Sequence, residues 1–194
     1  NEDWQTKFEL MNFKPFFDKD NKEKESIIVE IRDKNGSNLT SSIFTIESMQ
    51  KKTINISELL YDKKINNDHG TFSVYHEHIP IINQFEAFIA ERGYSLFKYK
   101  TLKTFSSVHG NLDAISFLDE KKQFLGKQTI LSKNFNIQFK FEDRYRYDLF
   151  FVNPTNKNLK VKIFFVKSNN KHSETITIAP GGSEFVNLKE GHNI

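Results

Sequence analysis

Apolar residues recur at every second position over many stretches of this chain, and polar turns separate these stretches. The clearest stretch is 159–165, where Leu159, Val161, Ile163 and Phe165 are separated by single residues. A period of two is typical of a β-strand with one buried face. The same pattern predicts further strands at 8–10, 26–32, 43–46, 54–56, 70–76, 94–99, 102–108, 114–118, 135–141, 149–152, 176–178 and 185–188.

Residues typical of turns separate these predicted strands. The pair Asn35-Gly36 predicts a hairpin, because both residue types accept a positive φ. The run 180–182, Pro-Gly-Gly, predicts another turn. Ser57 is expected to cap a short helical turn, since a serine hydroxyl suits a helix N-terminus.

The spacing of the strands is typical of an all-β protein, namely an antiparallel β-sandwich of jelly-roll or immunoglobulin-like type with at most short helical turns. The stretch 81–92 fits both a helical stripe and strand alternation, and a strand over 86–92 is favoured. Residues 1–194 are interpreted as a single unit, with a subdivision near residue 130 left open. No apolar run is long enough for a transmembrane helix.

The amino-acid composition argues against several classes of binding partner and excludes several kinds of chemical site. The chain has 20 phenylalanines, which predicts a Phe-rich core. A net charge of only +3, without a basic stripe, argues against a nucleic-acid partner. No cysteine is present, which excludes disulfides, thiol catalysis and cysteine zinc sites. The compartment is not fixed, although an extracellular or cell-surface location is slightly favoured.

One candidate metal site lies around His76 and His78, two residues apart at the end of a predicted strand and therefore on one face. Glu86 follows, and His109 ends a later strand and is a fourth candidate ligand. The run from Gly70 to Gly93 resembles the first motif of the cupin family, Gly-x5-His-x-His-x3–4-Glu-x6-Gly. Seven residues separate His78 from Glu86 in this chain, and the second cupin motif is not found.

The resemblance implies a divalent transition metal held by imidazoles and a carboxylate, with an open position for Lewis-acid or oxygen chemistry. The simpler interpretation is that His76 and His78 end a strand beside solvent and that no cofactor is bound. No catalytic residue is assigned, because the Ser, His and Asp residues within 106–113 lack a nucleophile elbow.

A second candidate site is aromatic and polar. The run 143–148, Asp-Arg-Tyr-Arg-Tyr-Asp, places two tyrosines on one face of a strand and two arginines on the other. Tyrosine rings stack on sugars while flanking polar groups donate and accept hydrogen bonds. The alternative is a half-buried edge strand. The candidate ligand-binding residues are Tyr94, Tyr99, Arg144, Tyr145 and Tyr147.

These observations favour a non-catalytic β-sandwich module that binds carbohydrate or protein, or takes part in assembly. Whether the chain is an enzyme stays open, and the interpretation leans against it. One alternative is a cupin-like metal-dependent enzyme with a site at His76 and His78. Another is a subunit of a homo-oligomer or filament in which sheet edges pair between copies.

Overall fold

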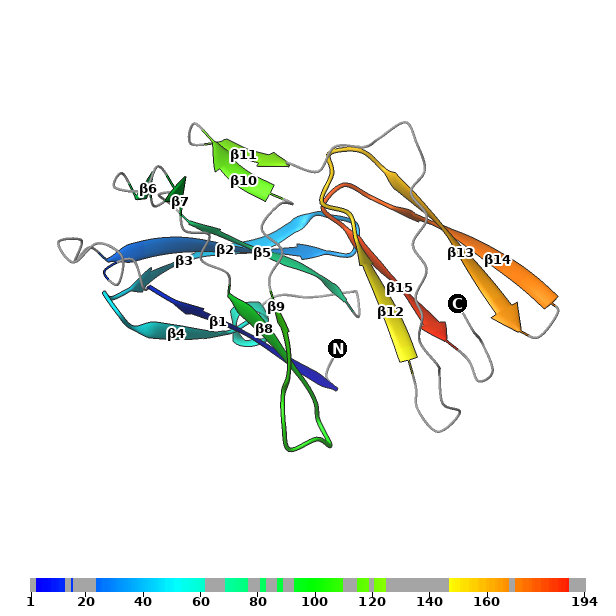
Figure 1. Ribbon diagram of the computed structural model, residues 1–194, viewed down its shortest axis with the longest axis horizontal. Helices are drawn as coiled ribbons and strands as arrows, with labels where there is room; N and C mark the ends of the chain where they lie inside the picture. Colours follow the sequence, from blue (N-terminus) through cyan, green and yellow to red (C-terminus); the bar gives the residue numbers. More distant parts are fainter. Residues whose placement is uncertain are drawn as a thin grey trace.

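The computed structural model is an all-β protein built from antiparallel sheets, which confirms the predicted sandwich class (Figure 1). One short 3₁₀ turn accompanies the strands. In the part of the chain described by the structure, no helix is long and apolar enough to cross a membrane. The structure describes residues 3–12, 15, 24–61, 69–76, 81–82, 87–88, 93–109, 115–118, 121–124, 147–167 and 170–188.

The first sheet has the strand order β4-β1-β8-β9, and every pairing in it is antiparallel. Its central strand β1 alternates as predicted, so that Phe8 and Leu10 are both buried. The strand β9 is shorter than the predicted 102–108, because Leu102 donates a backbone hydrogen bond to Tyr99 in the turn that reverses the chain. The bounds are β1 Trp4–Met11, β4 Lys51–Asn55, β8 Tyr94–Tyr99 and β9 Ser106–His109.

The second sheet has the order β3-β2-β5, with the long strand β2 in the centre. The predicted turn at Asn35-Gly36 joins β2 to β3, and Gly36 has a φ of +84°. A single irregularity in the β2–β3 pairing lies near this turn, between Ile31 and Arg32. The bounds are β2 Glu25–Asp33, β3 Asn38–Ile46 and β5 Gly70–His76.

The first two sheets enclose the main hydrophobic core. Most of its buried residues come from alternate positions of β1 and β2, because only one face of each strand meets the other sheet, and the rest lie in or next to β3 and β4. Among the described residues this core is dominated by isoleucine and valine, not by the phenylalanine expected from composition. β-branched side chains suit central strands. The buried members are Phe8, Leu10, Ile27, Val29, Ile31, Ile46, Ile54 and Ile56.

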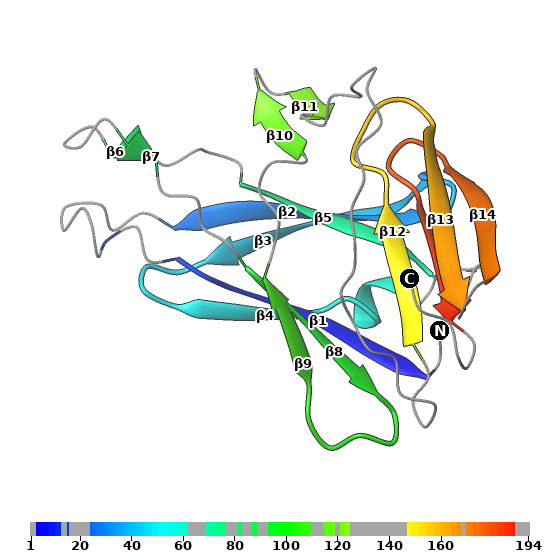
Figure 2. The ribbon, with the colours of Figure 1, turned by 45° about the vertical axis from the view of Figure 1, so that its right-hand side comes forward.

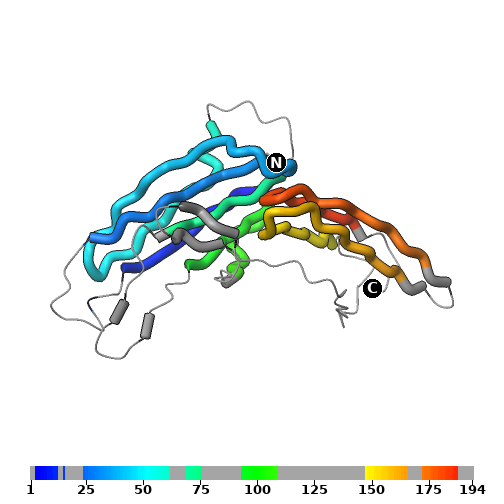
Figure 3. The backbone as a smooth tube through the Cα atoms, turned by 90° about the horizontal axis from the view of Figure 1, so that it is seen from above, coloured from blue at the N-terminus to red at the C-terminus, as the bar shows by residue number. Residues whose placement is uncertain are grey.

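The C-terminal strands form two antiparallel pairs, β12 with β15 and β13 with β14. Figures 1 and 3 show these yellow-to-red strands continuing to one side of the first two sheets. Between the pairs lies a second core cluster, in which Ile163, Phe165 and Val186 are buried. The bounds are β12 Tyr147–Val152, β13 Leu159–Lys167, β14 Asn170–Ile178 and β15 Ser183–Leu188.

The remaining elements are short. The predicted strand 114–118 is present as β10, which pairs with β11 and contacts β5 (Figure 2). The short turn η1, Glu58–Leu60, is preceded by Ser57, whose side chain makes no capping hydrogen bond, unlike the expectation. The predicted strand 135–141 lies outside the described residues. The other bounds are β6 Ile81–Ile82, β7 Ala87–Phe88, β10 Ile115–Leu118 and β11 Lys121–Phe124.

Hydrogen bonds join the C-terminal strands to the second sheet. The amide of Ser183 donates to the Lys34 carbonyl at 3.0 Å, and the Thr71 hydroxyl donates to the Gly181 carbonyl at 2.9 Å. The ring of His69 lies 3.2 Å from the Ser183 carbonyl through Nε2. A carbonyl oxygen only accepts, so Nε2 carries the hydrogen in this contact. The 33–37 turn and the turn before β15 are thus fixed against each other.

Candidate ligand-binding site

An aromatic pair with one exposed member lies where β1 begins and β8 ends. Trp4 is directly opposite Tyr99 on β8, and their rings pack edge to face with centroids 5.2 Å apart. Trp4 lies on the same strand face as Phe8, but it is at the end of the sheet and is 44% exposed. Packing against Tyr99 restricts the indole, and a large part of its surface stays available to a ligand.

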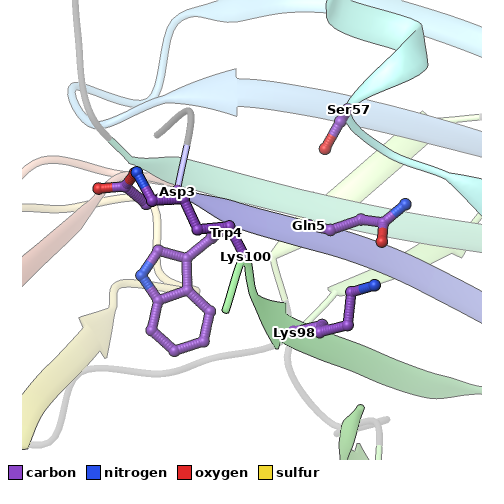
Figure 4. Close-up of a pocket in the computed structure, with 6 residues that line it drawn as sticks. All are labelled: Asp3, Trp4, Gln5, Ser57, Lys98 and Lys100. Atoms are coloured by element: carbon purple, nitrogen blue, oxygen red, sulfur yellow. The ribbon is translucent and has the colours of Figure 1, made fainter. Parts of the chain in front are cut away.

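Polar residues in or next to β1, β4 and β8 surround the same end of the sheet. Together with Trp4 they line a shallow depression of about 300 Å³. The register places Gln5 beside Lys98, and Ser57 follows the last residues of β4. Figure 4 shows the six residues around the beginning of β1. They are Asp3, Trp4, Gln5, Ser57, Lys98 and Lys100.

Charges are balanced on one side of this depression and positive on the other. Asp3 and Lys100 form an ion pair, and the Lys100 amide also donates to the Asp3 carbonyl at 2.8 Å. Lys98 and Lys7 each hold their ammonium 5.1 Å from the ring centroid of Phe105. Because neighbouring strand positions face opposite sides, Gln5 and Lys98 lie on the face opposite Trp4 and Tyr99, so the polar groups border this end of the sheet from both faces.

Three of the predicted ligand-binding residues lie in the described part of the chain. Tyr94 is opposite Glu9, and Tyr99 is opposite Trp4 at the other end of β8. Because five positions separate Tyr94 from Tyr99, they lie on opposite faces of the strand. Tyr147 packs against the second core cluster. The other two candidates, Arg144 and Tyr145, lie outside the described residues.

The candidate metal ligands are described only in part. His76 is the last residue of β5 and pairs with Ile27, while His109 is the last residue of β9 and pairs with Tyr94. Their backbones thus belong to edge strands of different sheets. The side chains of both histidines, together with His78 and Glu86, lie outside the described part. Among the residues whose side chains are described, no group of three or more His, Asp or Glu could hold a metal ion.

Sequence reasoning did not single out Trp4 as a binding residue. In the alternating run at the N-terminus, the pattern predicts that Trp4 is buried in the core like Phe8 and Leu10. One available signal was that Trp4 is the only tryptophan in the chain and stands at the first position of its strand. The last positions of a strand often extend beyond the opposing sheet, and burial there depends on tertiary structure.

Comparison with known proteins adds no family assignment. No protein-family model matches the sequence, and a search of the curated proteins finds no match either.

Proposed function

We propose that this chain is a non-catalytic β-sandwich binding module that holds carbohydrate at the Trp4 depression. The observation that carries this proposal is the half-exposed indole of Trp4, which packs against Tyr99 at 5.2 Å, with polar residues at the same end of the sheet. The apolar face of a sugar ring stacks on an indole, and its hydroxyls take hydrogen bonds from the surrounding groups.

The polar neighbours support a sugar better than an apolar ligand. Ser57 offers a hydroxyl, and Gln5 and Lys98, on the strand face opposite Trp4, offer further donors to a ligand that extends around the end of the sheet. The depression is small and open, so it fits one or two sugar residues of a longer chain and not an enclosed small molecule. Modest affinity per site is therefore expected.

Tryptophan fluorescence tests the proposal directly, because the single tryptophan is in the proposed site. The full chain is first screened on an array of plant, microbial and animal glycans. Soluble oligosaccharides that bind are then titrated while the emission of Trp4 is followed. We expect a saturable change in emission with at least one oligosaccharide class.

Two variants separate the site from nonspecific binding. Trp4→Ala is expected to weaken glycan binding about tenfold or more in calorimetry, equivalent to roughly 1.4 kcal/mol. Phe164→Ala is the matched control, because Phe164 is an aromatic residue that is 52% exposed on β13, in a different sheet from Trp4. Absence of binding to every glycan class, or equal affinity of Trp4→Ala and the unmodified chain, would overturn the proposal.

A further inference from the structure

Strand β3, Asn38–Ile46, is an edge strand without charge. It pairs with β2 on one side, and no other described strand pairs with its second edge. Its nine residues, Asn-Leu-Thr-Ser-Ser-Ile-Phe-Thr-Ile, include no charged residue, proline or glycine. Seen from above in Figure 3, β3 forms the outer border of its sheet. From Thr40 to Ile46 its register with β2 is regular.

The other described edges of the first two sheets are charged, short or in contact with further strands, whereas β3 contacts the short turn η1 and, among the described strands, pairs with β2 alone. Strand β4 begins with Lys51 and Lys52, and charged edges resist pairing with other chains. Strand β9 has only four residues. Strand β5 is uncharged, but it contacts β10 and β15. A long, regular, uncharged edge is the kind of surface on which strand addition takes place.

A solvent-facing isoleucine lies near the middle of this edge strand. Ile43 is 67% exposed and pairs across the sheet with Ile28. Its neighbours on the same strand face are Ser41 and Thr45, which are small, uncharged and exposed. The outer face of β3 therefore carries an apolar centre between two hydroxyl positions.

We propose that β3 pairs antiparallel with β3 of a second copy of this chain, around a two-fold axis at Ile43. In this register Ile43 lies opposite Ile43 of the second copy, and Ser41 lies opposite Thr45. The two three-stranded sheets then form one continuous six-stranded sheet. A row of four isoleucines, Ile28 and Ile43 from each copy, crosses the junction on one face.

The second copy is favoured as the occupant because the strand is complementary to itself in this register. No like charges meet, since β3 has none. The exposed isoleucine meets an identical apolar side chain, and the hydroxyl residues meet each other. An isologous contact of this kind closes at the dimer and leaves no β3 edge exposed. The inference does not depend on carbohydrate binding at Trp4, which is on the other sheet.

Self-association is measured on the full chain by sedimentation velocity and light scattering from about 1 to 500 μM. We expect a monomer–dimer equilibrium. Ile43→Lys places two like charges on the axis and should weaken dimerisation at least tenfold while the melting temperature of the monomer stays close to that of the unmodified chain. The matched control is Val108→Lys, on edge strand β9, where the valine is 56% exposed.

Cross-linking tests the register itself, and the absence of native cysteine makes each introduced thiol unique. Oxidised Ile43→Cys should form a disulfide-linked dimer, and a mixture of Ser41→Cys and Thr45→Cys chains should form the mixed dimer in preference to either homodimer. Val108→Cys should not cross-link. A monomer at all concentrations would overturn the proposal, and so would a dimer that Ile43→Lys leaves intact or that cross-links equally through Val108→Cys.

Discussion

Gly181 lies directly against the guanidinium of Arg32, so that a Cβ on Gly181 would clash with Arg32 Nη1. The φ of Gly181 is +67°, a conformation that L-residues with side chains seldom adopt. Arg32 in turn donates through Nη2 to buried Glu30 at 2.8 Å, and it cannot move without disturbing this ion pair. The turn before β15 and the outer face of β2 are thus packed against each other through this glycine.

Gly181→Ala should therefore destabilise the protein for two reasons. The left-handed backbone costs about 1–2 kcal/mol for alanine, and displacement of the guanidinium adds to this cost. Urea denaturation of the single variants and the double variant measures both contributions. In the Arg32→Ala background the cost of Gly181→Ala should fall toward the backbone contribution alone. Equal costs in the two backgrounds would contradict the contact.

The side chain of Asn153 connects several backbone segments of the C-terminal strands through hydrogen bonds. Its side chain is fully buried, and Nδ2 lies within 3.0 Å of the carbonyl oxygens of Lys157, Ile178 and Ala179. Its Oδ1 accepts from the amide and hydroxyl of Thr155. Both ends of the amide are used, so no isosteric residue can replace it.

Asn153→Asp should unfold the C-terminal strands at lower temperature than any exposed substitution, because a carboxylate oxygen would face three carbonyl oxygens. Unpaired buried polar groups cost about 1–3 kcal/mol each, and more when charged. Thermal melting followed by circular dichroism checks this expectation. Asn187→Ala is the control, since that asparagine is exposed and bonds only Asp148 among the contacts described for its side chain. Similar melting temperatures for the two variants would show that the amide network contributes little.

Tyr75 should make the protein sensitive to alkaline pH. Burial raises the pKa of the Tyr75 phenol above its ordinary value of 10.0, and the negative charge of Glu30 raises it further. Because the folded protein holds the phenolic proton more tightly than the unfolded chain, the unfolded chain loses that proton first as the pH rises. The unfolding free energy is therefore unaffected by Tyr75 below pH 10 and falls as the pH rises above 10.

The measurement compares unfolding free energies of the unmodified chain and Tyr75→Phe from pH 8 to pH 11. Above about pH 10 the unmodified chain should lose more unfolding free energy than Tyr75→Phe does. Because lysines titrate in the same range, Tyr61→Phe provides the reference for an exposed tyrosine. A parallel pH dependence for all three proteins would contradict the assigned environment of Tyr75.

Neighbouring positions of β13 should respond very differently to truncation. Ile163 is 5% exposed within the second core cluster, whereas Phe164 is 52% exposed on the opposite face. Ile163→Ala should cost about 2–5 kcal/mol because it removes packed methyl groups and leaves a cavity. Phe164→Ala should cost less than about 1 kcal/mol. Chemical denaturation of both variants distinguishes them, and equal costs would mean that the strand is rotated.

Much of the secondary structure could be predicted from local pattern. The period-two runs predicted β2, β8 and β13, and Asn35-Gly36 predicted the turn where Gly36 has a φ of +84°. The separation of Tyr94 from Tyr99 was also open to prediction, because an odd spacing on a strand means opposite faces. The pairing of strands into sheets could not be predicted in this way, because β1 pairs with strands that begin at Lys51 and Tyr94, far along the chain.

The sequence by itself determined the strands, the turn residues and the faces that alternate, because these depend on backbone geometry and neighbouring residues. Only the tertiary structure decided which of those faces are covered. Trp4 and Phe8 share one face of β1, and the opposing sheet covers Phe8 while it leaves Trp4 half exposed beside Tyr99. In the same way β3 alternates like its neighbours, and only the strand order among the described residues places it at the border of its sheet. Burial and edge position arise from contacts between distant segments, which a local pattern does not contain.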